Sequence, residues 1–299
     1  MAASRVVVVR SDRAWGPGGE PDRGVLRALI VRGFELLTGR LDPAGAVTAV
    51  FKPEDRVGVK INTIGGRAIS TRPELALEFA DYLASGGLRR ENIIIWDRTN
   101  RELRDAGYRL EAARKELKIL GTDSGGVGYD RELVGHRNVG SMFSAIQKNM
   151  ITASVSLAVL KDHGIAGVTA GMKNYFGAVH NPNKYHDSGC NPYVAEIFDC
   201  PVVRSKHRLS VLDCLLIQFH KGPAYHPRWA HKFGGLVFSL DPVAADRVGW
   251  LIIERLRASA DLPTLAAENR EPAYLETAEK MGLGSARLDK IELIEESLT

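Results

Sequence analysis

Short runs of β-branched and apolar residues alternate with amphipathic helical segments along this chain of 299 residues. The apolar runs predict strands at Arg5–Arg10, Val57–Ile61, Ile93–Trp96, Ala153–Leu160, Leu209–Ile217, Gly235–Ser239 and Lys290–Ile294. Helical spacing predicts helices at Asp22–Thr38 and Pro73–Ser85, near Arg101–Leu117 and Met142–Met150, and after Asp241-Pro242. This alternation is typical of an α/β fold with a mostly parallel sheet flanked by helices.

The organisation of the chain favours one domain. No internal repeat, low-complexity tract or linker interrupts it. A length of 299 residues suits one large α/β domain or two modest ones, and the continuity favours a single α/β domain over residues 1–299.

Charge and hydropathy exclude several classes of partner. The 40 Lys and Arg residues against 36 Asp and Glu leave a net charge of +4 without a concentrated basic patch, so we expect no nucleic acid partner. No apolar stretch is long enough to span a bilayer, so we expect no membrane partner. The first residues, MAASRVVVVRSDRAW, do not read as a signal peptide, and the cytoplasm is the default expectation. A chain whose export signal had been removed would look the same.

The three cysteines argue against a cysteine-ligated cluster. Cys190, Cys200 and Cys214 form no CxxC pair, and their odd number does not suit a disulfide framework. We therefore expect no iron–sulfur cluster. Cys214 falls inside a predicted strand and is expected in the core, whereas Cys190 lies in a Ser-Gly-Cys-Asn loop.

Polar clusters follow five of the predicted strands. They are Asn62–Arg67 with Lys60 beside it, Asp97–Asn100, Lys161–His163, Gln218–Lys221 and Asp241. If these strands are parallel, all five clusters meet at the carboxyl ends of the strands, where open α/β sheets bind ligands. The sequence therefore predicts a ligand site at this edge of the sheet.

The glycine-rich segment 160–191 holds several side chains that could ligate a metal. His163, His180 and His186, with Cys190, Asp97 or Asp187 completing the set, could bind iron, zinc, nickel or copper. Their spacing matches no established zinc signature. The alternative is that these histidines cap loops and bond to the backbone.

Lysines at the strand ends indicate a different role. Lysine is costly to bury without a partner, so Lys60, Lys161 and Lys173 either face solvent or meet an anion. Gly164, Gly167 and Gly171 precede Lys173 in a loop that is not a P-loop but could present backbone N–H groups to a carboxylate or phosphate. The alternative is a solvated lysine on a purely structural loop.

Three aspartates outside the lysine and histidine clusters have their own expected roles. Asp241 is expected to cap a helix that begins at Pro242. Asp213, in an apolar strand, and Asp246, one turn inside that helix, are either paired or functional if buried.

Several motifs resemble the family of proteins with a domain of unknown function numbered 362, in members without an appended ferredoxin module. These motifs are FKPEDRVGVKINTIGG, STRPELA, ENIIIWDRTNRELRDAGY, LKDHGIAGVTAGMKNYFGAV, LDPVAADRVGW and GLGSARLDKIELIE. The resemblance implies a single α/β domain with a site at Lys60, Asn62, Asp97, Lys161, His163, Lys173, Asn174, His186 and Asp246. Many relatives carry iron–sulfur modules or export signals, which implies redox settings, but this chain shows neither feature.

Together these patterns predict a metal-assisted enzyme that acts on a small anion, a carboxylate or a phosphate, with redox chemistry favoured by the family setting. His163, Lys161, Lys173 and Asp97 are the predicted catalytic residues. Substrate binding is assigned to Lys60, Asn62, Asn174 and Arg67, and metal binding to His163, His186, His180 and Cys190. The alternative is a non-catalytic carrier or sensor for a metal or small anion. The oligomeric state is left open, a homo-oligomer included.

Overall fold

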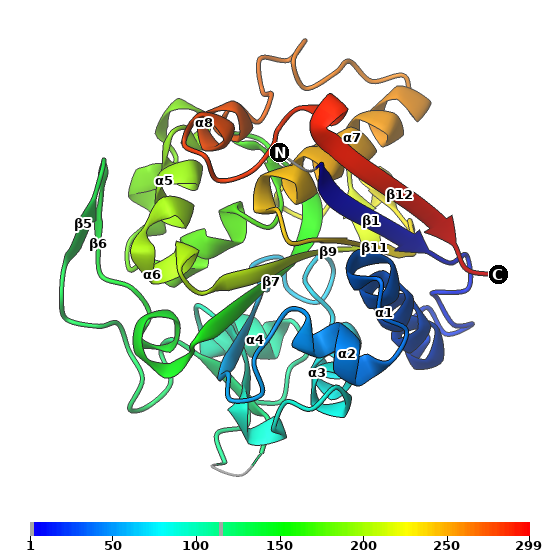
Figure 1. Cartoon of the computed structure of the whole chain (residues 1–299). Helices are drawn as coiled ribbons and strands as arrows, with labels where there is room; N and C mark the ends of the chain where they lie inside the picture. The colour runs from blue at the N-terminus through cyan, green and yellow to red at the C-terminus, as the bar shows by residue number, and fades with distance from the viewer. Residues whose placement is uncertain (1–2, 114–115) are drawn as a thin grey trace.

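One large sheet connects both ends of the chain in the computed structural model, which describes residues 3–113 and 116–299 (Figure 1). Its strand order is β12-β1-β11-β9-β7-β2-β3-β4, with β8 paired to β7 and β10 paired to β9. The strands are β1 Ser4–Arg10, β2 Val57–Ile61, β3 Ile93–Asp97, β4 Lys118–Gly121, β7 Ala153–His163, β8 Gly167–Thr169, β9 His207–Gln218, β10 Ala230–His231, β11 Gly235–Ser239 and β12 Ile291–Ser297.

The centre of the sheet is parallel. Strands β9, β7, β2, β3 and β4 all run in one direction, and β12 runs parallel to β1. The sequence prediction of a mostly parallel sheet in a single α/β domain is therefore confirmed.

Helices cover both faces of the sheet (Figure 1). One face packs against α1 Arg23–Thr38, α2 Pro43–Thr48, α3 Pro73–Ser85 and α4 Asn100–Asp105. The other packs against α5 Tyr193–Asp199, α6 Pro201–Arg204, α7 Pro242–Ser259 and α8 Tyr274–Lys280. Alternate residues of β1 enter the two cores, Val7 and Val9 on one side and Val6 and Val8 on the other, as the twofold period of a strand requires.

Side chains cap α1 and α7 where the sequence predicts it. Asp22 accepts a hydrogen bond from the Val25 N–H at the start of α1, and Asp241 accepts from the N–H groups of Val243 and Ala244 at the start of α7. Within the described ranges no helix is both long and apolar enough to cross a bilayer.

The direction of β11 differs from the expectation. Its predicted bounds are correct, but it runs antiparallel to β9 and to β1. The connection from β9 contains only a three-residue helical turn, Pro227–Trp229, and the short strand β10, so it lacks the crossover helix that a parallel strand needs. The Asp241 cluster therefore lies beside the amino ends of the central parallel strands. Four clusters, rather than five, lie at the carboxyl ends of those strands.

Four further segments differ from the sequence prediction. Strand β7 continues past Leu160 to His163, because β8 pairs with its last three residues. The helix expected near Arg101–Leu117 ends at Asp105, and residues 114 and 115 of that range lie outside the described residues. The helix expected near Met142–Met150 is a single π-helical stretch, Ile146–Met150. A hairpin that the sequence did not reveal precedes it, formed by β5 Val134–His136 and β6 Val139–Ser141.

Candidate functional site

A cavity of about 200 Å³ lies where strands β2, β3 and β7 end. Eight of the residues predicted for the site line it together: Lys60, Asn62, Asp97, Lys161, His163, Lys173, Asn174 and His186. The parallel register of these strands explains the convergence, since their carboxyl ends meet at one edge of the sheet.

The floor of the cavity is a buried ion pair. Lys60 Nζ lies 2.6 Å from Asp97 Oδ1 and also donates to the Ile61 carbonyl and to Asn174 Oδ1. Asp97 Oδ2 accepts from the backbone N–H and the hydroxyl of Thr63, at 2.7 and 2.6 Å. Because both charges are paired and fully hydrogen-bonded, this pair is suited to holding the strand ends together.

Lys161 and Lys173 lack such a partner. Lys161 is 0% exposed and Lys173 6%, yet among the described residues neither has a carboxylate oxygen within 4.0 Å. Lys161 Nζ donates to Asn62 Oδ1 at 3.3 Å and to the Ile69 carbonyl at 3.2 Å, while Lys173 Nζ lies 4.0 Å from the Phe176 ring centre. Burial lowers the pKa of each lysine to about 8. The cavity thus contains two ammonium groups that, among the described residues, are not paired directly with a carboxylate.

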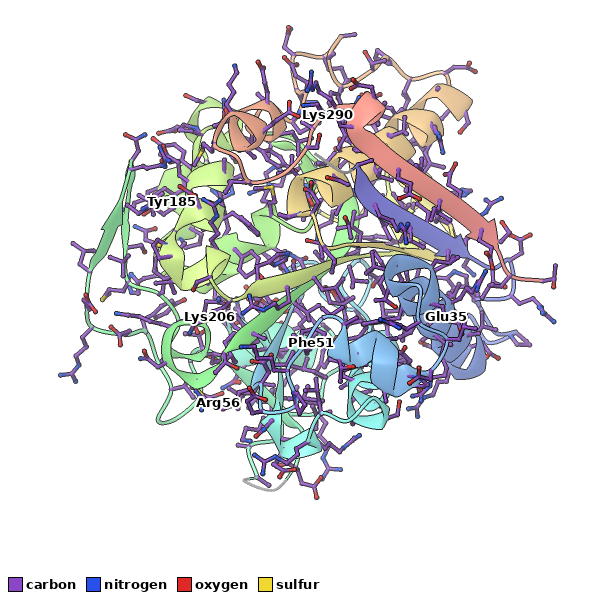
Figure 2. All side chains as sticks on the ribbon, viewed as in Figure 1. Glu35, Phe51, Arg56, Tyr185, Lys206 and Lys290 are labelled. Atoms are coloured by element: carbon purple, nitrogen blue, oxygen red, sulfur yellow. The ribbon has the colours of Figure 1, made fainter. Side chains whose placement is uncertain are left out.

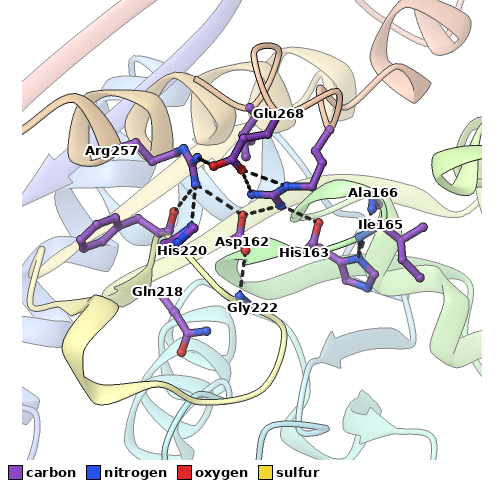
Figure 3. A network of polar contacts seen from close by, with 12 residues as sticks. Asp162, His163, Ile165, Ala166, Gln218, His220, Gly222, Arg257 and Glu268 are labelled. Atoms are coloured by element: carbon purple, nitrogen blue, oxygen red, sulfur yellow. Dashed lines mark hydrogen bonds and ion pairs between the residues drawn. The ribbon is translucent and has the colours of Figure 1, made fainter. Parts of the chain in front are cut away.

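The proton position on His163 follows from its backbone contacts. Its Nδ1 accepts hydrogen bonds from the N–H groups of Ile165 and Ala166, at 3.2 and 3.1 Å (Figure 3). A neutral ring that accepts at Nδ1 carries its proton on Nε2. Burial, with the charge of Lys173 adding to it, lowers the pKa of His163 to about 3, so the ring is neutral. His163 therefore presents an N–H donor to the cavity.

His186 has the opposite tautomer. Its Nδ1 lies 3.1 Å from the Pro182 carbonyl oxygen and must donate to it, which leaves a lone pair on Nε2. That Nε2 lies 3.3 Å from Lys173 Nζ. Burial and the charge of Lys173 lower the pKa of His186. The rings of His163 and His186 stack at 5.8 Å, so one cavity holds a histidine donor beside a histidine acceptor.

The glycine loop before Lys173 is held by Asp246 of α7. Asp246 Oδ1 accepts from the Gly171 N–H at 2.7 Å, Oδ2 accepts from the Met172 N–H at 3.1 Å, and Tyr274 donates to Oδ2 at 2.9 Å. The sequence suggested that backbone N–H groups of this loop hold an external anion. Two of them are instead taken by Asp246, which is fully buried and acts on the site through Lys173.

Alternation along β7 sends its last residues in two directions. Lys161 and His163 line the cavity, whereas Asp162 between them points to the other face. There Asp162 Oδ1 lies 2.9 Å from Arg270 Nη1, and Oδ2 accepts from the Gly222 N–H at 2.7 Å (Figure 3).

A second layer of charges supports Asp162. Arg270 and the fully buried Arg257 both pair with Glu268, and Arg257 Nη2 lies 2.7 Å from its carboxylate (Figure 3). Arg270 also donates to the His163 carbonyl oxygen at 3.4 Å. This network ties the segment between α7 and α8 to the end of β7 and so fixes the backbone that carries Lys161 and His163.

Three predicted site residues lie outside the cavity wall. Arg67 is exposed and pairs with Glu20 at 3.4 Å. His180 is exposed and packs edge-on against Tyr129. Cys190 is buried beside Lys173, and burial raises the pKa of its thiol. Their sequence neighbours reach the cavity, but these side chains do not.

The predicted metal ligands do not converge. Nδ1 of His163 is taken by the backbone and its Nε2 carries the proton, while Nε2 of His186 faces an ammonium group. Within residues 3–113 and 116–299, no three His, Cys, Asp or Glu side chains are grouped to hold a metal ion. In this arrangement the four side chains cannot all ligate one metal ion. Metal binding by a subset of them stays a prediction.

Sequence reasoning missed several residues at the site. Arg98, Glu102, Thr169 and Asn183 also line the cavity. Arg98 belongs to a polar cluster that the sequence had singled out, and so does Thr63, which holds Asp97. Nothing in the sequence pattern around Arg270 signals its role, because it reaches β7 from more than a hundred residues away.

Residues 57–250 match the sequence model of a family described as "Domain of unknown function (DUF362)". The match covers more than half of the chain, so the chain belongs to this family. No curated protein matches it.

Proposed function

We propose that this member of the family of unknown function is an enzyme that binds a small carboxylate or phosphate between Lys161 and Lys173 and moves protons on it. One observation carries the proposal: two nearly fully buried lysines share a cavity and have no carboxylate within 4.0 Å in the described part of the chain. A buried charge without a counter-charge is costly, and a bound anion offsets that cost.

The histidines support chemistry rather than mere binding. His163 offers an N–H that can hydrogen-bond to a developing oxyanion, and His186 offers a lone pair that can act as a general base, within one cavity. The size of the cavity, about 200 Å³, suits a substrate smaller than those of typical ligand pockets, which measure roughly 300–1,000 Å³. The redox preference rests on the family setting alone and gains no support from this geometry.

Anion binding is tested first by calorimetric titration with oxalate and with phosphate. Lys161→Met and Lys173→Met are each expected to weaken binding about tenfold to a hundredfold, the effect of losing one charge-assisted hydrogen bond of about 1.5–3 kcal/mol. Lys206→Met is the matched control. Lys206 is a half-buried lysine on the loop before β9, outside the cavity, and donates to the carbonyls of Gln147 and Lys148 (Figure 2). Equal affinity in all four proteins would overturn the proposal.

Turnover is tested by incubating the protein with panels of small carboxylates and phosphates and following them by NMR. His163→Asn keeps an acceptor near the position of Nδ1 and removes the Nε2 N–H, so it is expected to bind the anion yet lose turnover. If the variant converts the substrate at the wild-type rate, the Nε2 N–H of His163 has no role in turnover. Anion binding by the wild-type protein without turnover of any substrate favours the alternative, a non-catalytic carrier or sensor.

A further inference from the structure

Lys161 and Lys173 face different partners, although both are buried in the same cavity. Lys161 donates to two carbonyl oxygens, of Asn62 and Ile69, which can accept but never take a proton. Lys173 lies 3.3 Å from His186 Nε2, whose lone pair is directed to the cavity because Nδ1 is bonded to Pro182. Of these two lysines, Lys173 is the one whose amine contacts a base within the described residues.

Resting on the proposed anion site, we propose that Lys173 is a nucleophile that forms an imine with the carbonyl carbon of a 2-oxo acid, while Lys161 holds the carboxylate. An amine next to a base is the arrangement that activates lysine for covalent catalysis. A carboxylate on the carbon next to the carbonyl places the anion and the reacting carbon within one small ligand, as a cavity of about 200 Å³ requires.

The reaction balances without an oxidant or a metal. The Lys173 ammonium gives a proton to His186 Nε2, and the free amine attacks the carbonyl carbon. As the N–C bond forms, the carbonyl π electrons move to oxygen, which takes the proton back from His186. The nitrogen, now carrying two hydrogens and a positive charge, gives one proton to His186 Nε2 to leave a neutral carbinolamine. The hydroxyl takes that proton and leaves as water, and the nitrogen lone pair forms the C=N bond. An ammonium and a ketone thus become a protonated imine and one water.

The surroundings of Lys173 agree with this role. Burial lowers the pKa of Lys173 to about 8, so roughly a tenth of the amine is free at pH 7. The Phe176 ring, 4.0 Å from Nζ, stabilises the positive charge, both of the resting ammonium and of the protonated imine. His163 lines the same cavity and supplies an N–H for the carbonyl oxygen.

Reductive trapping tests the inference. The full-length protein is incubated with pyruvate or glyoxylate and sodium cyanoborohydride, and the adduct is located by intact mass and peptide mapping. One adduct, confined to Lys173, is expected. Lys173→Met should lose it, Lys206→Met should label like the wild-type protein, and Lys161→Met should need at least tenfold more pyruvate for the same labelling.

Oxalate separates the two proposals, because it carries carboxylates but has no ketone or aldehyde carbonyl and forms no imine under these conditions. Oxalate binding that depends on Lys161, with adducts absent or spread over surface lysines, overturns the imine and leaves the anion site standing. An adduct confined to Lys161 also overturns the assignment to Lys173. No binding of oxalate or phosphate overturns the proposed function itself.

Discussion

Lys60 Nζ lies 2.6 Å from Asp97 Oδ1, and this ion pair joins the ends of the neighbouring parallel strands β2 and β3. Lys60 is 1% exposed and Asp97 5%, so neither charge is shielded by solvent. Lys60 is the one lysine of the described cavity wall with a carboxylate partner. The charge of Lys60 is therefore balanced by Asp97, whereas Lys161 and Lys173 have no carboxylate within 4.0 Å in the described residues.

Breaking the Lys60–Asp97 pair is expected to be costly. Lys60→Met or Asp97→Asn alone leaves one buried charge without its partner and should lower the free energy of unfolding by about 3–5 kcal/mol. The double variant should lose clearly less than the sum of the two single changes. Urea denaturation of the four proteins gives the coupling energy, and strict additivity would contradict the pairing.

Removing the two unpaired lysines is expected to have the opposite effect on the ligand-free protein. In the folded state the pKa of each is lowered to about 8 from an ordinary value of 10.5, so the unfolded chain binds more protons between these pH values. Stability therefore rises as pH increases from about 8 to 10.5, by roughly 3 kcal/mol at most for each lysine. A Lys161→Met/Lys173→Met variant should be more stable at pH 7 and lack this rise. Denaturation series at several pH values check both statements.

Anion affinity should fall with pH in the same window. Only the ammonium forms of Lys161 and Lys173 attract an anion, and both groups lose their protons above a pKa of about 8. The dissociation constant for oxalate should rise about tenfold per pH unit above 8 for each lysine that must be charged. Titrations from pH 7 to 10 measure the slope. Lys161→Met should reduce the slope of the logarithm of the dissociation constant against pH by one. A slope of zero in the wild-type protein would count against both lysines.

The loop that carries Lys173 should depend on Asp246. Asp246→Asn replaces one carboxylate oxygen by an NH₂ group facing a backbone N–H of Gly171 or Met172, and should destabilise the protein by about 1–3 kcal/mol while weakening oxalate binding. Tyr274→Phe is the matched control, because it removes one hydrogen bond to the same carboxylate and leaves both backbone contacts in place. We expect it to cost about 1 kcal/mol and to bind oxalate normally. Equal effects of the two variants on binding would show that the loop does not need Asp246.

Much of the site was predictable because it follows strand ends. Lys60, Asp97 and Lys161 sit at the carboxyl ends of apolar runs, and parallel pairing of those runs brings the side chains together. Arg67 was grouped with them on the same basis but lies on the exposed part of its loop, paired with Glu20. Position in the sequence places a residue near an edge of the sheet; it does not decide which way its side chain points.

The sequence by itself determined seven of the strands, the long helices and the caps of α1 and α7, since hydrophobic periodicity and capping side chains act over a few residues. Only the tertiary structure decided that β11 runs antiparallel, because strand direction depends on how a connection crosses the sheet. It likewise decided that Lys60 has a carboxylate partner, while Lys161 and Lys173 have none in the part of the chain that the structure describes. The side chains that balance a charge in a cavity come from strands and loops far apart in the chain. A local sequence pattern does not contain the distances between such side chains.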